Sequence, residues 1–422
     1  MERWVSAIGV FAMVGVAWLL SVDRRRVPWR VIAWGLMLQF TFGVIVLKTR
    51  PGVWFFGVLN DAVLALLGFT ERGTAFVFGE YASERFTIAL NVLPTIIFFS
   101  ALMTVLYHLG VMQRVVRAFA WLMRRTMRTS GAETLSVAAN SFVGMTEAPL
   151  MIAPFVRSMT MSELMAVMTG GFATVAGGVL AAYVGMLKDV VPDIAGHLIA
   201  ASVMSAPAAL VVAKVMWPAE EHSAERAEPL GEAVQAQPDV NVIDAAARGA
   251  SEGLRLALNV GAMLLAFIAL VALANALLGL PTALYNDWAG LEGAAAWAPL
   301  TIQDILGWIF WPLALLIGIP VGECSAIATL LGEKIVLTEF IAYLHLSEEL
   351  STGTVALSPR TLVIASYALC GFANFGSIGI QLGGIGGIAP ERRHDLARLG
   401  LRAMFGGLLA SLMTASIAGL LY

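Results

Sequence analysis

The sequence predicts an all-α polytopic membrane protein, with eight transmembrane helices and two re-entrant hairpins arranged as an inverted repeat. Three observations predict this class. The 422 residues are 59% hydrophobic and only 13% charged, about half the charged fraction that is usual in soluble domains. Eight apolar runs have the length of about 20 residues that a membrane helix needs. Two further apolar regions are interrupted at their centres by polar residues, glycine and proline.

The same composition argues against other classes of protein. A net charge of −3 provides no basic surface, so we expect no nucleic-acid partner. Two cysteines, Cys324 and Cys370, are too few for a disulfide framework. The sequence contains no nucleophile or metal-ligand motif, so we do not expect an enzyme. A membrane-embedded enzyme with two glutamates as acid and base is the alternative from another class.

The apolar runs define the expected elements. The eight spans lie near residues 3–21, 30–48, 87–110, 163–187, 195–216, 254–280, 360–388 and 399–421. The two interrupted regions are 131–158, broken between Asn140 and Pro149, and 303–332, broken between Gly318 and Glu323. Non-helical backbone at membrane depth is tolerated only where protein or a water-filled cavity covers it, so we interpret both regions as re-entrant hairpins.

The distribution of basic residues predicts the orientation. If the N-terminus lies outside, 18 of the 26 Lys and Arg fall on the inner side, which satisfies the positive-inside rule. Both termini of this inner-membrane protein are then on the outer side. Residues 112–128 read as a basic amphipathic helix on the inner surface, 217–240 as a cytoplasmic loop, and 52–70 as an interfacial segment on the outer side.

These elements group into four parts of the chain. Residues 1–130 form an N-terminal scaffold of spans 1–3 and the amphipathic helix, and 131–216 form the first repeat of hairpin 1 and spans 4–5. Residues 217–300 hold the cytoplasmic loop and scaffold span 6, and 301–422 form the second repeat of hairpin 2 and spans 7–8.

Related motifs follow the two hairpins. Gly171-Phe-Ala-Thr174 in the first repeat corresponds to Gly371-Phe-Ala-Asn374 in the second, and the hairpin tips end in Glu147 and Glu323. A match of three residues also arises by chance in a chain this rich in glycine and alanine. Inverted repeats with broken helices are typical of secondary transporters, which bind their substrate where the breaks meet.

Polar residues at the breaks suggest what is bound. Carboxylates within a membrane face a cavity or a partner, although Glu147 and Glu323 also suit a role as helix caps. With Asn374 and Ser377 they provide the acceptors and donors that a hydroxyl-rich ligand needs. Asn140 and Thr174 are uncharged oxygen ligands that suit Na⁺, although such a Thr often bonds its own helix.

With these residues in view, the chain resembles the concentrative nucleoside transporter family over nearly its whole length. The most specific motifs are Gly144-Met-Thr-Glu-Ala-Pro-Leu150, Ala176-Gly-Gly-Val-Leu-Ala181, Asn241-Val-Ile-Asp-Ala-Ala246, Leu256-Ala-Leu-Asn-Val-Gly-Ala-Met263, Cys370-Gly-Phe-Ala-Asn374 and Ala389-Pro-Glu-Arg-Arg393. The resemblance implies the eight-span, two-hairpin fold of that family, a homotrimer in the lipid bilayer, and nucleoside import driven by Na⁺ or, in some members, by H⁺.

The resemblance also implies the site residues. Those expected near the base are Met145, Thr146, Glu147 and Val179. Those expected to hold the ribose are Glu323, Phe372, Asn374 and Ser377. Those expected around Na⁺ are Asn140 and Thr174, together with the main-chain carbonyls of Val143 and Val175.

Three positions depart from the family pattern. Met145 stands where the family usually has Gln or a similar polar residue, so the base preference is open. The tip Pro320-Val-Gly-Glu323 replaces Pro-Trp-Asn-Glu, and Thr338-Glu-Phe340 replaces Asn-Glu-Phe. The alternative function is therefore a proton-coupled symporter of nucleosides or modified nucleosides, with a base selectivity altered by Met145.

Overall fold

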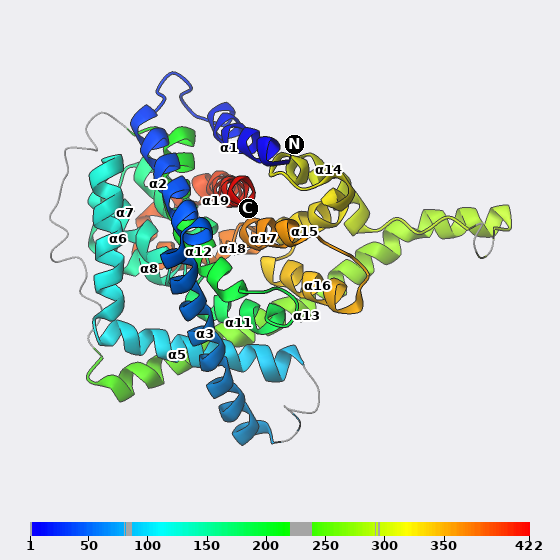
Figure 1. Ribbon diagram of the computed structural model, residues 1–422, viewed down its shortest axis with the longest axis horizontal. Coiled ribbons are helices and arrows are strands. Elements are labelled where there is room, and N and C mark those ends of the chain that lie inside the picture. The colour runs from blue at the N-terminus through cyan, green and yellow to red at the C-terminus, as the bar shows by residue number, and fades with distance from the viewer. Residues whose placement is uncertain (1, 80, 82–86, 220–238, 292, 294–295) are drawn as a thin grey trace.

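A computed structural model describes residues 2–79, 81, 87–219, 239–291, 293 and 296–422 (Figure 1). All regular elements in these ranges are helical. They are α1 (Glu2–Leu19), α2 (Trp29–Lys48), α3 (Arg50–Phe78), η1 (Ile88–Val92), α5 (Leu93–His108), α6 (Val111–Met127), α7 (Gly131–Asn140), α8 (Glu147–Leu150), α9 (Ala153–Val156), α10 (Met161–Ala173), α11 (Gly177–Leu187), α12 (Ile194–Met216), α13 (Val242–Ala289), α14 (Ile302–Leu316), η3 (Val321–Glu323), α15 (Cys324–Val336), α16 (Glu339–Thr352), α17 (Pro359–Leu369), α18 (Phe375–Ile388), η4 (Pro390–Arg392) and α19 (Arg393–Leu421).

Eight helical stretches of the described chain are long and apolar enough to cross a membrane. Seven of them coincide with expected spans. They are Glu2–Leu19, Trp29–Lys48, Ile88–His108, Met161–Leu187, Ile194–Met216, Val242–Ala289 and Pro390–Leu421. The expected span 360–388 is not continuous. It consists of α17 and α18, and residues 370–374 form a break between them. The eighth long apolar stretch is α3, which includes the segment expected at the outer surface.

Two polar contacts tie α3 to the helices beside it. Asn60 Oδ1 accepts a hydrogen bond from Ala195 N at 3.2 Å, and Glu71 pairs with Lys188 at 3.2 Å. Both partners lie in or beside the short connection between α11 and α12. Asn60 and Glu71 are about 16 Å apart along the helix, so α3 runs across the end of these two spans.

Three spans form the core of the molecule. About 89% of the residues in the most apolar window of Met161–Leu187, of Ile194–Met216 and of Pro390–Leu421 are buried, against 11% for α13. Figure 1 shows α12 and α19 at the centre, with α17 and α18 beside them. It also shows α5 and the first half of α13 side by side, whereas the far end of α13 projects from the body. A core of buried spans is thus surrounded by helices with exposed apolar faces.

The amphipathic helix expected over 112–128 is present as α6. Its buried side chains recur every three or four residues, at Met112, Val116, Ala120, Met123 and Met127. Such a stripe faces the protein while the arginines between these positions point away from it. The loop expected over 217–240, which includes His222 and Arg226, lies mostly outside the described residues. Arg85, one of the basic residues counted for the orientation, also lies outside them.

Both interrupted regions form helix–turn–helix units. Region 131–158 folds into α7, a tip at 141–146, and the short helices α8 and α9. Region 303–332 folds into α14 and α15, which lie side by side around a turn at 317–323 (Figure 1). In addition, α15 forms a second hairpin with α16, whose tip is Leu337-Thr338. The sequence did not lead us to expect this second hairpin.

Candidate functional site

The breaks of the two repeats contact each other. Gly371 has φ +103°, a conformation that residues with a Cβ rarely adopt. A methyl group on Gly371 would lie 2.8 Å from the carbonyl oxygens of both Phe172 and Ala173, at the end of α10. The break after α17 therefore packs directly against the break after α10, as expected for an inverted repeat.

The second break positions a buried polar cluster. Asn374, the N-cap of α18, accepts a hydrogen bond at Oδ1 from Ser377 N at 2.8 Å. Its Nδ2 donates to Glu339 Oε2, also at 2.8 Å. The other carboxylate oxygen, Glu339 Oε1, accepts from Tyr183 OH at 2.8 Å. All four side chains are buried, so the predicted residues Asn374 and Ser377 do come together, with Glu339 as their carboxylate.

Glu339 is the site residue that our sequence reasoning missed. It is the first residue of α16 and follows the N-cap Thr338, as Glu147 is the first residue of α8 and follows the N-cap Thr146. The repeated Thr-Glu pair is a sequence signal that could have identified it. In each repeat this pair opens the second arm of a hairpin. Gly-Phe-Ala then ends α10 in the first repeat and directly follows the C-cap of α17 in the second.

The structure places Glu323 away from Asn374 and Ser377, with which the sequence grouped it. Glu323 Oε2 accepts hydrogen bonds from Ser358 N at 3.2 Å and from Ser358 Oγ at 3.1 Å. Ser358 is the N-cap of α17, whereas Asn374 lies beyond the opposite end of that helix. An 11-residue helix is about 16 Å long, so α17 separates Glu323 from the polar cluster.

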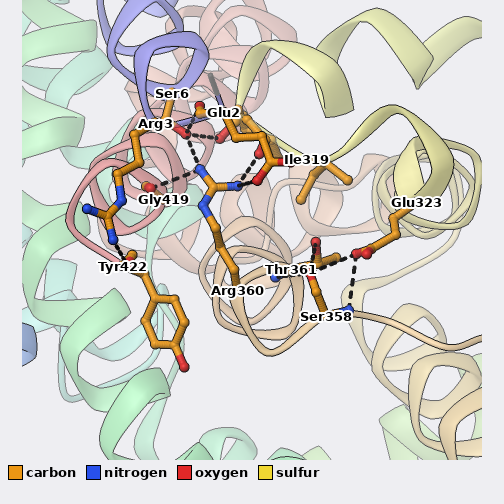
Figure 2. A network of polar contacts seen from close by, with 12 residues as sticks. Glu2, Arg3, Ser6, Ile319, Glu323, Ser358, Arg360, Thr361, Gly419 and Tyr422 are labelled. Carbon is orange, nitrogen blue, oxygen red and sulfur yellow. Dashed lines mark hydrogen bonds and ion pairs between the residues drawn. The ribbon is translucent and has the colours of Figure 1, made fainter.

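The turn that carries Glu323 belongs to a network at the chain termini (Figure 2). Arg360 donates to the carbonyl oxygen of Gly318, to Ser6 Oγ at 2.8 Å and to the carbonyl oxygen of Gly419 at 2.9 Å. These contacts join α1, α17, α19 and the turn after α14. The carbonyl of Gly318 and the side chain of Glu323 thus both link this turn to α17.

Lys334 holds the second break in place. Its side chain is fully buried, and its Nζ donates to the carbonyl oxygens of Ala368 at 2.8 Å and Cys370 at 3.1 Å. Both of these acceptors are main-chain oxygens. A cation suits these unpaired carbonyls at the C-terminus of α17, and it orients the backbone that leads to Asn374.

The tip of hairpin 1 rests on α10 and α18. Met145 is buried, and its Cβ would lie 2.9 Å from a methyl group on Gly171. Thr146 Cγ2 would lie 2.5 Å from a methyl group on Gly384, so α18 passes close to the tip. Glu147, the first residue of α8, is exposed. The remaining predicted contacts, Val179 in the first turn of α11 and Phe372 in the second break, are buried and half-buried.

The expected cation ligands lie around the same tip. Asn140 is 1% exposed, and neither its Oδ1 nor its Nδ2 has a hydrogen-bond partner among the described residues. The carbonyl oxygen of Phe142 accepts from Gly177 N at 3.2 Å, which brings the tip with Val143 to the break at 174–176, where Val175 lies. Thr174 Oγ1 donates to the carbonyl oxygen of Gly170 at 2.9 Å and keeps lone pairs for a cation.

This donor set fits Na⁺ better than a transition metal. In the described part of the chain, no group of three or more His, Cys, Asp or Glu is placed to hold a metal ion. Amide, hydroxyl and carbonyl oxygens are hard, uncharged ligands of the kind that broken transporter helices offer to Na⁺. An unpartnered buried amide is costly unless a ligand satisfies it, so Asn140 supports such a site.

Comparison with protein-family models covers most of the chain. Residues 8–81 match the N-terminal model and residues 197–419 the C-terminal model of the Na⁺-dependent nucleoside transporters, and residues 89–190 match a nucleoside-recognition "Gate" model. The chain belongs to the concentrative nucleoside transporter family. This membership confirms the predicted family and fold class, and the prediction that the chain is not an enzyme.

Several relatives of this concentrative nucleoside transporter family member are known. An uncharacterized transporter of Haemophilus influenzae is 42% identical over 98% of this chain and 97% of its own length. YutK of Bacillus subtilis, also an uncharacterized transporter, is 42% identical over 98% of both chains. The mouse sodium/nucleoside cotransporter 1 is 42% identical over the whole of this chain, which spans 64% of the mouse protein.

Solved structures of the family member CNTnw have the same fold. Its inward-facing substrate-bound state matches with a TM-score of 0.90 and 42% identity, over 100% of this chain and 98% of CNTnw. An outward-facing state of a CNTnw double variant matches with a TM-score of 0.89 over the same shares. The eight-span, two-hairpin inverted repeat is therefore the fold of this chain.

Proposed function

We propose that this chain is a Na⁺-coupled symporter that imports nucleosides across the cytoplasmic membrane. The observation that carries the proposal is the buried cluster of Glu339, Asn374 and Ser377 at the meeting point of two broken spans. Buried polar groups in an apolar protein are costly and are retained for binding or transport. The names of the sodium/nucleoside cotransporters, at 42% identity, support the same function.

The ribose is held by Glu339, Asn374 and Ser377 beside Phe372. A carboxylate accepts hydrogen bonds from two adjacent hydroxyl groups, and an amide both donates and accepts. When the nucleoside is absent, Tyr183 and Asn374 satisfy Glu339. Glu339 takes the role that the sequence assigned to Glu323, and hairpin 2 of the second repeat consists of α15 and α16.

The base lies against the tip of hairpin 1, near Met145, Thr146, Glu147 and Val179. This tip contacts α18 at Gly384, on the same helix that starts with the ribose cluster. A short, continuous surface thus joins the two expected parts of the ligand. Na⁺ binds on the other side of the tip, to Asn140 and Thr174 and to the carbonyls of Val143 and Val175, where the unpartnered Asn140 amide supports it.

Import requires the hairpin unit to move between two sides of the membrane. CNTnw and its variants are known in inward-facing, intermediate and outward-facing states. We propose a similar alternation here, in which α10–α12 and α15–α19 move with the hairpins against α5 and α13. Both chain termini then lie on the outer side, as the basic residues predict.

We also propose that the chain forms a homotrimer. The long helix α13 exposes a row of large apolar side chains, for example Leu258, Leu265, Leu273, Leu277 and Leu284. Lipid or a second copy can cover such a row, and the projecting end of α13 suits contact with a neighbour (Figure 1). The molar mass of the detergent-solubilised protein by light scattering tests this: three chains support it, and one chain overturns it.

Uptake into proteoliposomes tests the function. Purified protein should accumulate tritiated uridine or adenosine above the outside concentration when Na⁺ is higher outside. Equal rates with Na⁺ and K⁺ outside would overturn Na⁺ coupling, and uptake driven by a pH step alone would establish the H⁺ alternative. Absence of uptake for every nucleoside would overturn the substrate class.

A further inference from the structure

One buried polar side chain beside the tip of hairpin 1 has no role in the account above. Gln381 of α18 is fully buried. Its Nε2 donates to the carbonyl oxygen of Met168 at 3.0 Å, which links α18 to α10. Its Oε1 is buried and has no hydrogen-bond partner among the described residues. A carbonyl oxygen left unbonded in a protein interior is costly, so a partner is expected when the transporter is loaded.

The position of Gln381 distinguishes it from other buried amides. A methyl group on Gly171 would lie 2.6 Å from Gln381 Nε2 and 2.9 Å from Met145 Cβ, so the amide and the tip residue flank the same backbone atom. By contrast, Gln39 of α2 is equally buried and also has an unpartnered Oε1, but it bonds only to Gly35 of its own helix.

The helical spacing places Gln381 between the two halves of the site. Ser377, Gln381 and Gly384 recur at intervals of four and three residues, so they share one face of α18. Ser377 belongs to the Asn374 cluster, and Gly384 packs against Thr146. Gln381 thus lies one turn from the ribose cluster, toward the tip that faces the base.

The chemistry of the tip makes this amide useful. Met145 is a thioether, which accepts hydrogen bonds only weakly and donates none. The free Oε1 of Gln381 is a strong acceptor at the same place. An acceptor pairs with an amino group and not with a carbonyl oxygen at the same ring position, which is the difference between cytidine and uridine and between adenosine and inosine.

We propose that Gln381 is a specificity-determining residue, whose Oε1 accepts a hydrogen bond from the exocyclic amino group of the nucleobase. The proposal rests on the proposed function, because it assumes that a nucleoside occupies the site. The transporter then prefers cytidine to uridine and adenosine to inosine. If Gln381 only linked α18 to α10 through its Nε2 bond to Met168, its loss would lower the affinity for all nucleosides by the same factor.

Competition experiments test the proposal. Each of the four unlabelled nucleosides is titrated against uptake of tritiated adenosine by the wild type, by Gln381→Met, which is close in shape but lacks the amide, and by the matched control Gln39→Met. We expect a cytidine preference over uridine of about ten-fold in the wild type and the control, and its loss in Gln381→Met. The ratio of adenosine to inosine changes in the same way.

The outcomes separate this proposal from the proposed function. Uptake by Gln381→Met with an unchanged cytidine-to-uridine ratio would overturn the role of Gln381 and leave nucleoside transport intact. No uptake of any nucleoside by the wild type would overturn both. If Gln381→Met does not fold, Gln381→Glu keeps an acceptor oxygen at this place. It should keep the cytidine preference, and a cytidine-to-uridine ratio near one in Gln381→Glu would contradict the proposal.

Discussion

Asn374 Nδ2 donates to Glu339 Oε2 at 2.8 Å, which connects the break between α17 and α18 to the first residue of α16. This bond joins the tip of a hairpin to a broken span, the two features that define each repeat. It also prepares the carboxylate, because a nucleoside has only to replace bonds within a cluster that is already assembled. Preorganisation of this kind reduces the ordering that binding requires.

Replacing Gly371 by alanine should destabilise the protein. A Cβ there combines a φ of +103° with contacts of 2.8 Å to two backbone oxygens that cannot move aside easily. The expected cost is about 2–4 kcal/mol, measured as a lower temperature of thermal unfolding in detergent. Gly379→Ala is the matched control, because nothing lies within 4 Å of a Cβ added at Gly379, eight residues further along the chain. Equal unfolding temperatures for the two variants would contradict the packing of one break on the other.

Replacing Lys334 by methionine should weaken the site from a distance. The carbonyls of Ala368 and Cys370 lose a charged donor, and each such bond contributes about 1.5–3 kcal/mol. We expect a higher KM for nucleoside together with reduced thermal stability. Lys188→Met removes only an exposed ion pair with Glu71, and it should change neither quantity appreciably. A KM for Lys334→Met equal to that of the wild type would show that Lys334 does not position the site.

The residues show which parts of the molecule could be predicted from the sequence. The spans and hairpin 1 follow from long apolar runs, and Asn374 and Ser377 follow from a motif whose two members are close in the chain. Glu339 was missed because α16 carries polar residues such as His345, Glu348 and Glu349, which obscure a membrane hairpin. The apolar region around Glu323 offered a clearer pattern. The role of Lys334 could not be predicted, because its partners are main-chain oxygens some 35 residues away.

Replacing Asn140 by leucine should weaken the response to Na⁺ strongly without unfolding the protein. Neither amide atom has a partner in the described structure, so the substitution removes a cation ligand but no hydrogen bond between protein groups. We expect unchanged or higher stability without Na⁺, a much weaker stabilisation by Na⁺, and a half-saturating Na⁺ concentration for uptake at least about ten-fold higher. Asn60→Leu should do the reverse, since Asn60 Oδ1 accepts from Ala195 N: lower stability with a normal Na⁺ response. Full stabilisation of Asn140→Leu by Na⁺ would refute the proposed ion site.

The start of α13 should show a pH-dependent contribution to stability. Arg248 bonds both carboxylate oxygens of Asp239, at 2.7 and 2.9 Å, and these bonds hold the pKa of Asp239 below its usual value of 3.8. Because the folded pKa is lowered, the contribution is present above about pH 4 and is lost as the pH falls through the folded value. Asp239→Asn should therefore unfold at a slightly lower temperature than the wild type at pH 7, and the difference should shrink as the pH falls below about 4. A difference that grows at low pH would contradict this assignment.

The measurement that tests the central claim most directly compares nucleoside uptake by Glu339→Gln and Glu323→Gln in proteoliposomes with an inward Na⁺ gradient. Glu339 shares the buried cluster with Asn374, whereas Glu323 bonds Ser358 at the far end of α17. We expect Glu339→Gln to raise KM at least about ten-fold, because a charged acceptor is lost, and Glu323→Gln to stay within about two-fold of the wild type. Normal uptake by Glu339→Gln together with a large loss in Glu323→Gln would contradict the site described here.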